Sequence, residues 1–203
     1  MAQPPPPSPK TWRRYLPLGA FIVAAIVLAL AVAVPRIIAV DRGTASVGGP
    51  FALVDQHGAP VSDADFRGKL MLVYFGYTYC PDVCPTTLAT IGTALDKLSP
   101  EQRKQVAPIF ITIDPERDTQ KVIGDYVANF APDMLGLTGP IEAVEKVEHE
   151  YRVYAKKHPE ADGTYSMDHS SIVYLMDRDG KYRAIFSGEV KAADIVDGLK
   201  KYL

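Results

Sequence analysis

The chain has 203 residues, of which 47% are hydrophobic and 23% charged, and its formal net charge is −2. A charge this close to neutral argues against a nucleic-acid-binding protein, which normally carries a basic face. Beyond the N-terminal region, about 160 residues remain, a length that suits one domain with its own hydrophobic core.

The N-terminal region contains two different segments. Residues 1–15 include four consecutive prolines, a composition that cannot build a core, and we predict a disordered tail there. The stretch Leu16–Val34 contains no charged side chain, and its length is close to the roughly 20 residues that a helix needs to cross a bilayer. Pro35 then stops the helix. We therefore predict a single transmembrane anchor over residues 16–35.

Charges around this anchor predict its orientation. Lys10, Arg13 and Arg14 precede it without any acidic residue, so the positive-inside rule leaves the N-terminal tail in the cytoplasm. The tail is short and lacks the amphipathic pattern of a mitochondrial presequence. We predict a bacterial inner-membrane protein whose C-terminal domain lies in the periplasm. Two alternatives stay open: a signal peptide cleaved after the AVA sequence at 31–33, and a twin-arginine signal.

After the anchor we expect a linker over residues 36–49 and a folded domain over residues 50–203. Residues 51–55 and 60–66 are separated by a glycine-containing loop, which predicts a β-hairpin at the start of the domain. Residues 70–75 form an unbroken apolar run, the pattern of a strand that is buried on both faces. The cysteines of the chain follow this strand.

Further elements are predicted from helical spacing of apolar residues and from short apolar runs. In chain order they are a helix containing residues 88–98, a strand at 106–113, a helix at 122–130 capped by Asp118 or Thr119, a helix at 141–154, strands at 172–176 and 182–186 joined by a turn, and a last helix around 195–199. Strands that alternate with helices imply a sheet with parallel strands and helices on both faces. With two cysteines after the first long strand, this order predicts an α/β, thioredoxin-like domain.

Cys80 and Cys84, the only cysteines, lie between that strand and the next helix. A structural disulfide explains them poorly, because chain-entropy stabilisation grows with the loop enclosed and this loop is very short. The first turn of a helix favours a thiolate. Thioredoxin-type enzymes have two residues between their cysteines, whereas three stand here, which lets both sulfurs converge on one ion. Thiolates bind soft metals such as Cu(I), and also zinc.

A third ligand is expected among the four histidines. His57 in the hairpin loop, His149 in a helix and His158 before a proline are predicted to lie at the surface. His169 directly precedes the strand at 172–176, and in a thioredoxin-like sheet the loop that enters this strand faces the cysteine loop. His169 is therefore our predicted third metal ligand.

Four motifs together resemble the Sco/SenC family of copper-binding proteins: CPDVCP at 80–85, DPERDT at 114–119, LTG at 137–139 and DH at 168–169. They occur in the order of that family, and the similarity runs from about residue 50 to the C-terminus. The resemblance implies copper ligation, as Cu(I) or Cu(II), by Cys80, Cys84 and His169. It also implies that the chain delivers copper to the copper A centre in subunit II of cytochrome c oxidase. An upstream copper donor and a thiol reductant complete the expected partners.

Two aspartates are candidates for orienting the ligands, as groups around a metal site often do. Asp114 follows the strand at 106–113, although a turn-forming role before Pro115 explains it equally well. Asp168 is the neighbour of the predicted histidine ligand.

Two other functions compete with the metallochaperone that we predict. A membrane-tethered thiol-disulfide reductase would use the same cysteines; the extra residue between them argues against it. So does the absence of proline after residue 160, where thioredoxins place a cis-proline. A peroxiredoxin-like peroxidase is disfavoured because Pro85-Thr86-Thr87 follows Cys84, whereas a peroxidatic cysteine comes after such a motif. We therefore expect a copper carrier rather than an enzyme.

Overall fold

The structure, a computed structural model, describes residue 3, residues 47–187 and residues 189–203. The predicted transmembrane anchor at 16–35, the tail before it apart from residue 3, and most of the linker lie outside these residues. Within the described part of the chain, no helix combines the length and the apolar character needed to cross a bilayer.

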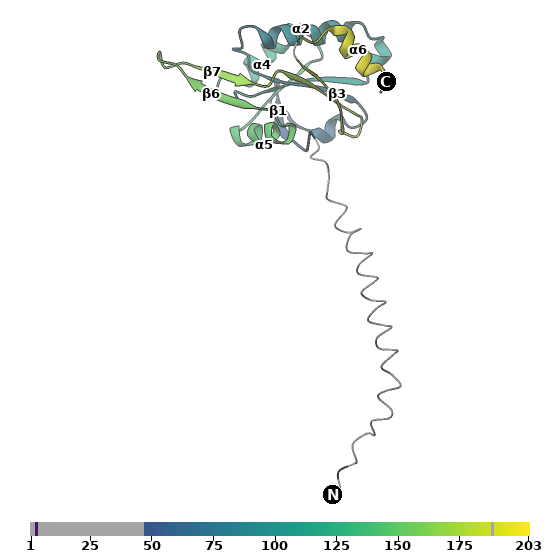
Figure 1. Ribbon diagram of the computed structural model, residues 1–203, viewed down its shortest axis with the longest axis horizontal. Coiled ribbons are helices and arrows are strands. Elements are labelled where there is room, and N and C mark those ends of the chain that lie inside the picture. Colours follow the sequence, from purple (N-terminus) through teal and green to yellow (C-terminus); the bar gives the residue numbers. More distant parts are fainter. Residues whose placement is uncertain (1–2, 4–46, 188) are drawn as a thin grey trace. The chain divides into compact units, whose positions relative to one another are not determined.

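A mixed sheet of seven strands forms the centre of the domain (Figure 1), in the order β2-β1-β5-β4-β3-β8-β9. From one edge to the other, these strands are β2 (Pro60–Ser62), β1 (Ala52–Asp55), β5 (Leu135–Thr138), β4 (Val106–Thr112), β3 (Leu70–Gly76), β8 (Ile172–Met176) and β9 (Tyr182–Ser187). Strands β3, β4 and β5 run parallel, and β8 runs antiparallel to β3. The predicted N-terminal hairpin is confirmed as β1 and β2.

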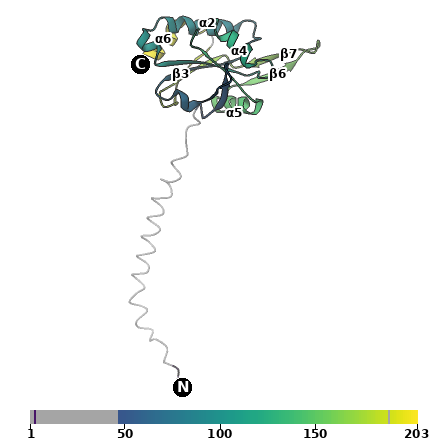
Figure 2. The same cartoon turned by 180° about the vertical axis from the view of Figure 1, so that it is seen from behind.

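Helices cover both faces of this sheet. They are α2 (Val83–Asp96), α3 (Pro100–Arg103), α4 (Gln120–Val127), α5 (Ile141–Tyr151) and α6 (Ala192–Lys200), with a 3-10 turn, η2 (Asp63–Phe66), after β2. In Figures 1 and 2, α2, α4 and α6 lie on one side of the sheet and α5 on the other. This arrangement confirms the predicted α/β, thioredoxin-like class. In α2, Leu88, Ile91 and Leu95 recur at helical spacing and are almost fully buried, so burial of this stripe holds the helix on the sheet.

The central strands bring two loops to the same edge of the sheet. Every residue of β3 and of β4 is buried, as their unbroken apolar sequences predict. The two strands pair in register from Leu70 with Val106 to Gly76 with Thr112. Because they end together, the cysteine loop after β3 and the loop after β4 start side by side. The carboxyl ends of parallel strands are the usual place for a ligand site.

A second, two-stranded sheet was not predicted. It consists of β6 (Ala155–Pro159) and β7 (Tyr165–His169), which pair antiparallel. The helix predicted at 141–154 ends earlier, at Tyr151, because Arg152 adopts a left-handed conformation with φ 56°. His158, which was predicted to lie at the surface, is half-buried in β6.

The described chain enters the domain in close contact with α5 and β8. The Gly48 amide donates to the Glu150 carbonyl oxygen at 2.8 Å. Gly48 has φ 91°, and a side chain there would collide with the end of Met176. Met176 pairs with Met71 at the beginning of β3, so this contact lies at the end of β3 that is remote from the cysteines.

Candidate metal centre

The two cysteines flank the beginning of α2. Cys80 lies in the loop after β3 and is 8% exposed, whereas Cys84 is the second residue of α2 and is fully buried. The backbone N–H of Cys84 donates to Cys80 Sγ at 3.4 Å. The helix N-terminus therefore stabilises a negative charge on the sulfur of Cys80. Pro85 is the third residue of α2, within the turn whose N–H groups have no partner in the helix.

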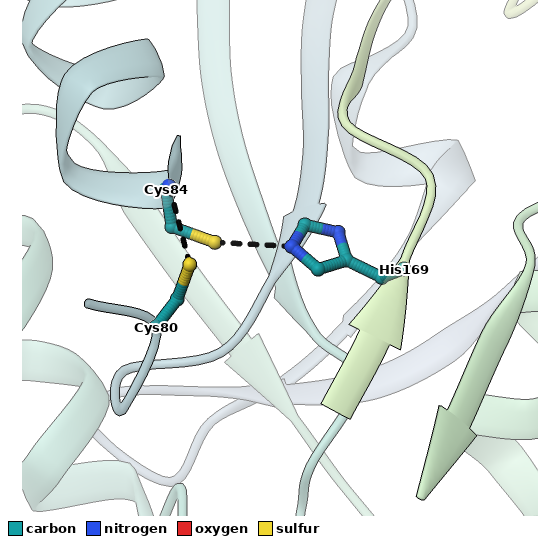
Figure 3. Close-up of side chains that lie close together, drawn as sticks. All are labelled: Cys80, Cys84 and His169. Carbon is teal, nitrogen blue, oxygen red and sulfur yellow. Dashed lines mark hydrogen bonds between the residues drawn. The ribbon is translucent and has the colours of Figure 1, made fainter. Parts of the chain in front are cut away.

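His169 approaches from the other side. Its Nε2 atom is 3.3 Å from Cys84 Sγ, and one ligand atom from each of Cys80, Cys84 and His169 lies within 4.8 Å of the others. Figure 3 shows the two sulfurs and the imidazole pointing toward one another. His169 is the last residue of β7 rather than part of a loop. It reaches the cysteines because Val173 of β8 pairs with Tyr74, near the end of β3.

The orientation of the His169 ring suits a metal ligand. Its Nδ1 atom lies 3.1 Å from the carbonyl oxygen of Ser170. A carbonyl oxygen only accepts, so Nδ1 carries the proton and, in a neutral ring, the lone pair on Nε2 faces the cysteines. Metal-binding histidines typically donate their second N–H in this way. The rings of Tyr74 and Tyr77 contact the imidazole edge to face.

The two aspartates predicted to orient the ligands have other partners. Asp168 is exposed, and its Oδ2 lies 2.8 Å from Nε2 of His158. Asp114 is buried and accepts from the hydroxyl of Tyr165 at 2.7 Å. Among the described residues, neither carboxylate is hydrogen-bonded to the His169 ring. Their orienting role stays a prediction, and the contact that the structure provides is the one from Ser170.

The two thiols differ in their affinity for a proton. A hydrogen bond from the Cys84 thiol, opposed by burial and assisted by the Cys84 N–H, lowers the pKa of Cys80 to about 4. The same hydrogen bond and burial raise the pKa of Cys84. The pair therefore holds one thiolate, on Cys80, and one thiol, on Cys84, over the physiological pH range.

We expect iodoacetamide to alkylate Cys80 selectively, even in mildly acidic solution. A depressed pKa keeps the thiolate present until the pH falls to about 4, so the rate at Cys80 should change less than about twofold between pH 8 and pH 5. An ordinary cysteine, with a pKa near 8.5, loses about tenfold per pH unit over the same range. Fragment-ion mass spectrometry of the labelled peptide distinguishes the two positions. Equal labelling of both cysteines, or a midpoint near pH 8.5 at Cys80, would contradict the assignment.

Tyr74 and Ser171 were missed by sequence reasoning. The hydroxyl of Tyr74 lies 3.6 Å from Cys84 Sγ and 3.2 Å from Ser171 Oγ. Burial raises the pKa of Tyr74, so this group stays protonated and can donate to the sulfur. The available signal was a tyrosine within an otherwise apolar buried strand, since a buried tyrosine hydroxyl usually has a hydrogen-bond partner.

Asp118 was predicted as a possible helix cap but supports the cysteine loop instead. Thr119 caps α4 by accepting from Val122 N. The buried carboxylate of Asp118 accepts from Thr78 N at 3.0 Å, from Thr78 Oγ1 at 2.6 Å and from Thr112 Oγ1 at 2.7 Å. Thr78 is two residues before Cys80, so Asp118 ties the cysteine loop to the end of β4.

Replacing Asp118 with alanine is expected to lower the free energy of unfolding by about 2 to 4 kcal/mol. The change leaves buried donors on Thr78 and Thr112 without an acceptor, and each such group costs about 1 to 3 kcal/mol. Urea denaturation measures the difference. Asp82→Ala is the matched control, because Asp82 is exposed in the same loop and its side chain makes no capping hydrogen bond. Equal stabilities of the two variants would show that Asp118 does not support the loop.

Comparison with known proteins gives a consistent picture. The SCO1/SenC family model matches residues 39–203. The mitochondrial SCO1 homolog 1 of Arabidopsis thaliana is 38% identical over 161 residues, which cover 79% of this chain and 48% of that protein. The chain thus spans about half the length of this relative.

Solved structures agree with the relationship. The copper-bound structure of ScoI from Bradyrhizobium japonicum is 45% identical, superimposes with a TM-score of 0.72, and covers 78% of this chain and 100% of that one. BsSco, described as a member of the Sco family of cytochrome c oxidase assembly proteins with a disulfide switch, is 27% identical with a TM-score of 0.62. That match covers 77% of this chain and 93% of BsSco.

Proposed function

Because the chain belongs to the SCO1/SenC family, we propose that it is a copper metallochaperone that delivers copper to the copper A centre of cytochrome c oxidase subunit II. The observation that carries the proposal is the group formed by Cys80, Cys84 and His169, whose ligand atoms lie within 4.8 Å of one another. Copper in the structure of the Bradyrhizobium relative and the family description of BsSco support it.

The donor set fits copper as a cargo. Two sulfurs and one imidazole form a soft site that suits Cu(I), and added water would complete a site for Cu(II). Structural zinc sites normally have four protein ligands. Among the described residues the group contains three, which favours a site that remains open to exchange.

Burial suggests the order in which ligands exchange. His169 is the half-buried member of the group, whereas Cys80 and Cys84 are both buried. A donor atom of the acceptor would therefore replace His169 first, while Cys80 and Cys84 still hold the ion.

An anaerobic titration of the reduced protein with Cu(I) tests the proposal. We expect one equivalent to bind tightly and then to transfer to a copper-free copper A domain. Cells that lack the protein should lose cytochrome c oxidase activity, with partial recovery in excess copper. Failure to bind copper, or binding without transfer, would contradict the proposal.

A thiol-disulfide reductase is the second candidate, and the lowered pKa of Cys80 beside the Cys84 thiol favours it. Such an enzyme would keep the cysteines of the acceptor reduced and would itself need a thiol reductant. Insulin reduction by the protein would support this activity. If an added thiol reductant, and never copper, restored oxidase activity to deficient cells, the reductase would replace the chaperone.

The chaperone is proposed to be tethered to the inner membrane by residues 16–35, with the domain in the periplasm. We expect a reporter fused after Leu203 to be active only outside the cytoplasm. We also expect the protein to sediment with membranes at its full mass. A soluble form that begins just after Ala33 would instead identify a cleaved signal peptide.

A further inference from the structure

The hairpin β6–β7 presents one face to the rest of the domain. Alternate residues of a strand point to the same side, so Tyr165 and His169 of β7 share a face. Tyr165 contacts Asp114 and Arg117, whereas His169 contacts Cys84. Contacts that hold Tyr165 in place therefore also help to set the position of His169 relative to the cysteines. In the described part of the chain, β6 and β7 pair only with each other, and Ala155 and Met167 supply the apolar contacts of the hairpin with the core.

Arg117 connects this hairpin to the cysteine loop. Its Nε donates to Asp114 Oδ2 at 2.5 Å, and its Nη1 donates to the backbone carbonyl oxygen of Tyr165 at 2.9 Å. Its guanidinium carbon is 3.7 Å from the centre of the Tyr165 ring and 4.7 Å from that of Tyr79. Tyr79 is the neighbour of Cys80. One side chain thus contacts both segments that carry the predicted ligands.

The charge of Arg117 alone does not explain this arrangement. The guanidinium makes two directed hydrogen bonds from a planar fork and contacts aromatic rings, a combination that an ammonium group cannot reproduce. A second ion pair, between Lys157 Nζ and Glu116 at 2.5 Å, joins the hairpin to the loop after β4 but is exposed. Exposed pairs of this kind stabilise a structure weakly. The side chain of Arg117 is only 21% exposed, so its contacts hold the hairpin better than the Lys157–Glu116 pair does.

We infer that Arg117 is a positioning residue for copper retention: it holds the β6–β7 hairpin so that His169 stays within reach of Cys80 and Cys84. This inference rests on the proposed copper function and adds to it the control of one ligand. When Arg117 is lost, Asp118 still holds the cysteine loop through Thr78, whereas the β6–β7 hairpin loses its hydrogen bond at Tyr165. Disturbing a group that orients a metal ligand typically lowers metal affinity about 10- to 100-fold.

The test measures Cu(I) affinity of the full-length chain by competition with a chromogenic chelator. We expect Arg117→Gln to weaken binding about 10- to 100-fold. Arg117→Lys should bind copper nearly as weakly, because lysine keeps the positive charge but lacks the planar guanidinium group. Arg183→Gln is the matched control: Arg183 also pairs with an aspartate, Asp177, and lies over an aromatic ring, that of Tyr202. It should bind copper as the parent does.

A double-mutant cycle separates positioning from general damage to the fold. If Arg117 acts through His169, Arg117→Gln should have almost no effect on affinity when His169 is already alanine. An equal loss in both backgrounds, an unchanged affinity of Arg117→Gln in the parent, or full rescue by lysine would each overturn the inference. Tyr165→Leu removes the ring over the guanidinium and provides a second route if Arg117→Gln does not fold.

A copper-free measurement keeps the two proposals distinguishable. In the reduced apoprotein, nitrogen-15 NMR of the imidazole groups should show shifted or broadened His169 signals in Arg117→Gln and unchanged signals in Arg183→Gln. Unchanged His169 signals in both variants would overturn the positioning role. If the parent bound no copper while these signals changed as expected, the copper function would fail and the structural link between Arg117 and His169 would stand.

Discussion

Serine at position 80 or 84, or alanine at position 169, is expected to lower copper affinity more than 100-fold in each case. Changing a group that only orients a ligand already lowers metal affinity about 10- to 100-fold. These substitutions remove a donor atom itself, so their effect should be larger. Each variant leaves two of the three ligands, which cannot satisfy a trigonal ion. Competition with a chromogenic Cu(I) chelator under anaerobic conditions measures the loss.

The other histidines provide matched controls for this experiment. His57 and His149 are exposed. His158 is on β6 and pairs with Asp168 of β7. Alanine at any of these three positions should leave copper affinity unchanged. Circular dichroism melting curves of all six variants show whether the folds remain intact. Full affinity in folded His169→Ala would rule out the three-ligand site, and a loss in one of the controls would point to a different histidine.

Oxidation of the cysteine pair is expected to abolish copper binding just as completely. Both thiols are free in the structure, and their sulfur atoms lie within 4.8 Å of each other. A disulfide needs a sulfur–sulfur distance of about 2.05 Å, so a small movement of the Cys80 loop suffices. Forming this bond releases two protons and two electrons to an oxidant such as diamide. It removes both soft donors and leaves His169 alone.

The measurement compares copper binding by the diamide-treated protein, by the reduced protein and by oxidised protein that has been treated with a thiol reductant. We expect more than a 100-fold loss on oxidation, a larger effect than the loss of an orienting group, and full recovery on reduction. The Cys80→Ser variant, which already binds copper weakly, should not lose further copper affinity when it is treated with diamide. Retention of tight binding by the fully oxidised protein would exclude the thiols as the principal ligands.

The central part of the fold could be predicted from sequence because its signals are strong. The runs at 70–75 and 106–113 are continuous and apolar, and both became strands that are buried along their whole length. These apolar runs, together with the helical spacing of apolar residues in the segments between strands, predicted the layered arrangement. The proximity of His169 to the cysteines followed from this topology, since a strand entering beside the end of β3 must begin near the loop that leaves it.

The elements that were missed have weak or ambiguous sequence signals. Strand β5 has four residues, LGLT, too few to show a period. Strands β6 and β7, with sequences AKKHP and YSMDH, carry polar residues on both faces, and only Ala155 and Met167 pack apolar side chains against the core. Propensity reasoning finds strands by their half-buried apolar face, and two such residues are too few to show a period.

The supporting contacts around the site were also beyond sequence reasoning. Asp118 reaches Thr78 across 40 positions, and Arg117 reaches Tyr165 across 48. Both residues belong to the DPERDT motif, where local rules suggested a turn and a helix cap. Local patterns describe neighbours along a chain, whereas these side chains act on segments that only the completed sheet brings near.

The contact of Gly48 with α5 and Met176 places the entry of the described chain at the end of β3 that is far from the thiols. Met176 pairs with Met71 at the start of β3, and the cysteines follow the other end of this strand, a strand length on the order of 20 Å away. A pull transmitted through the preceding chain would thus act on the pole opposite the thiols.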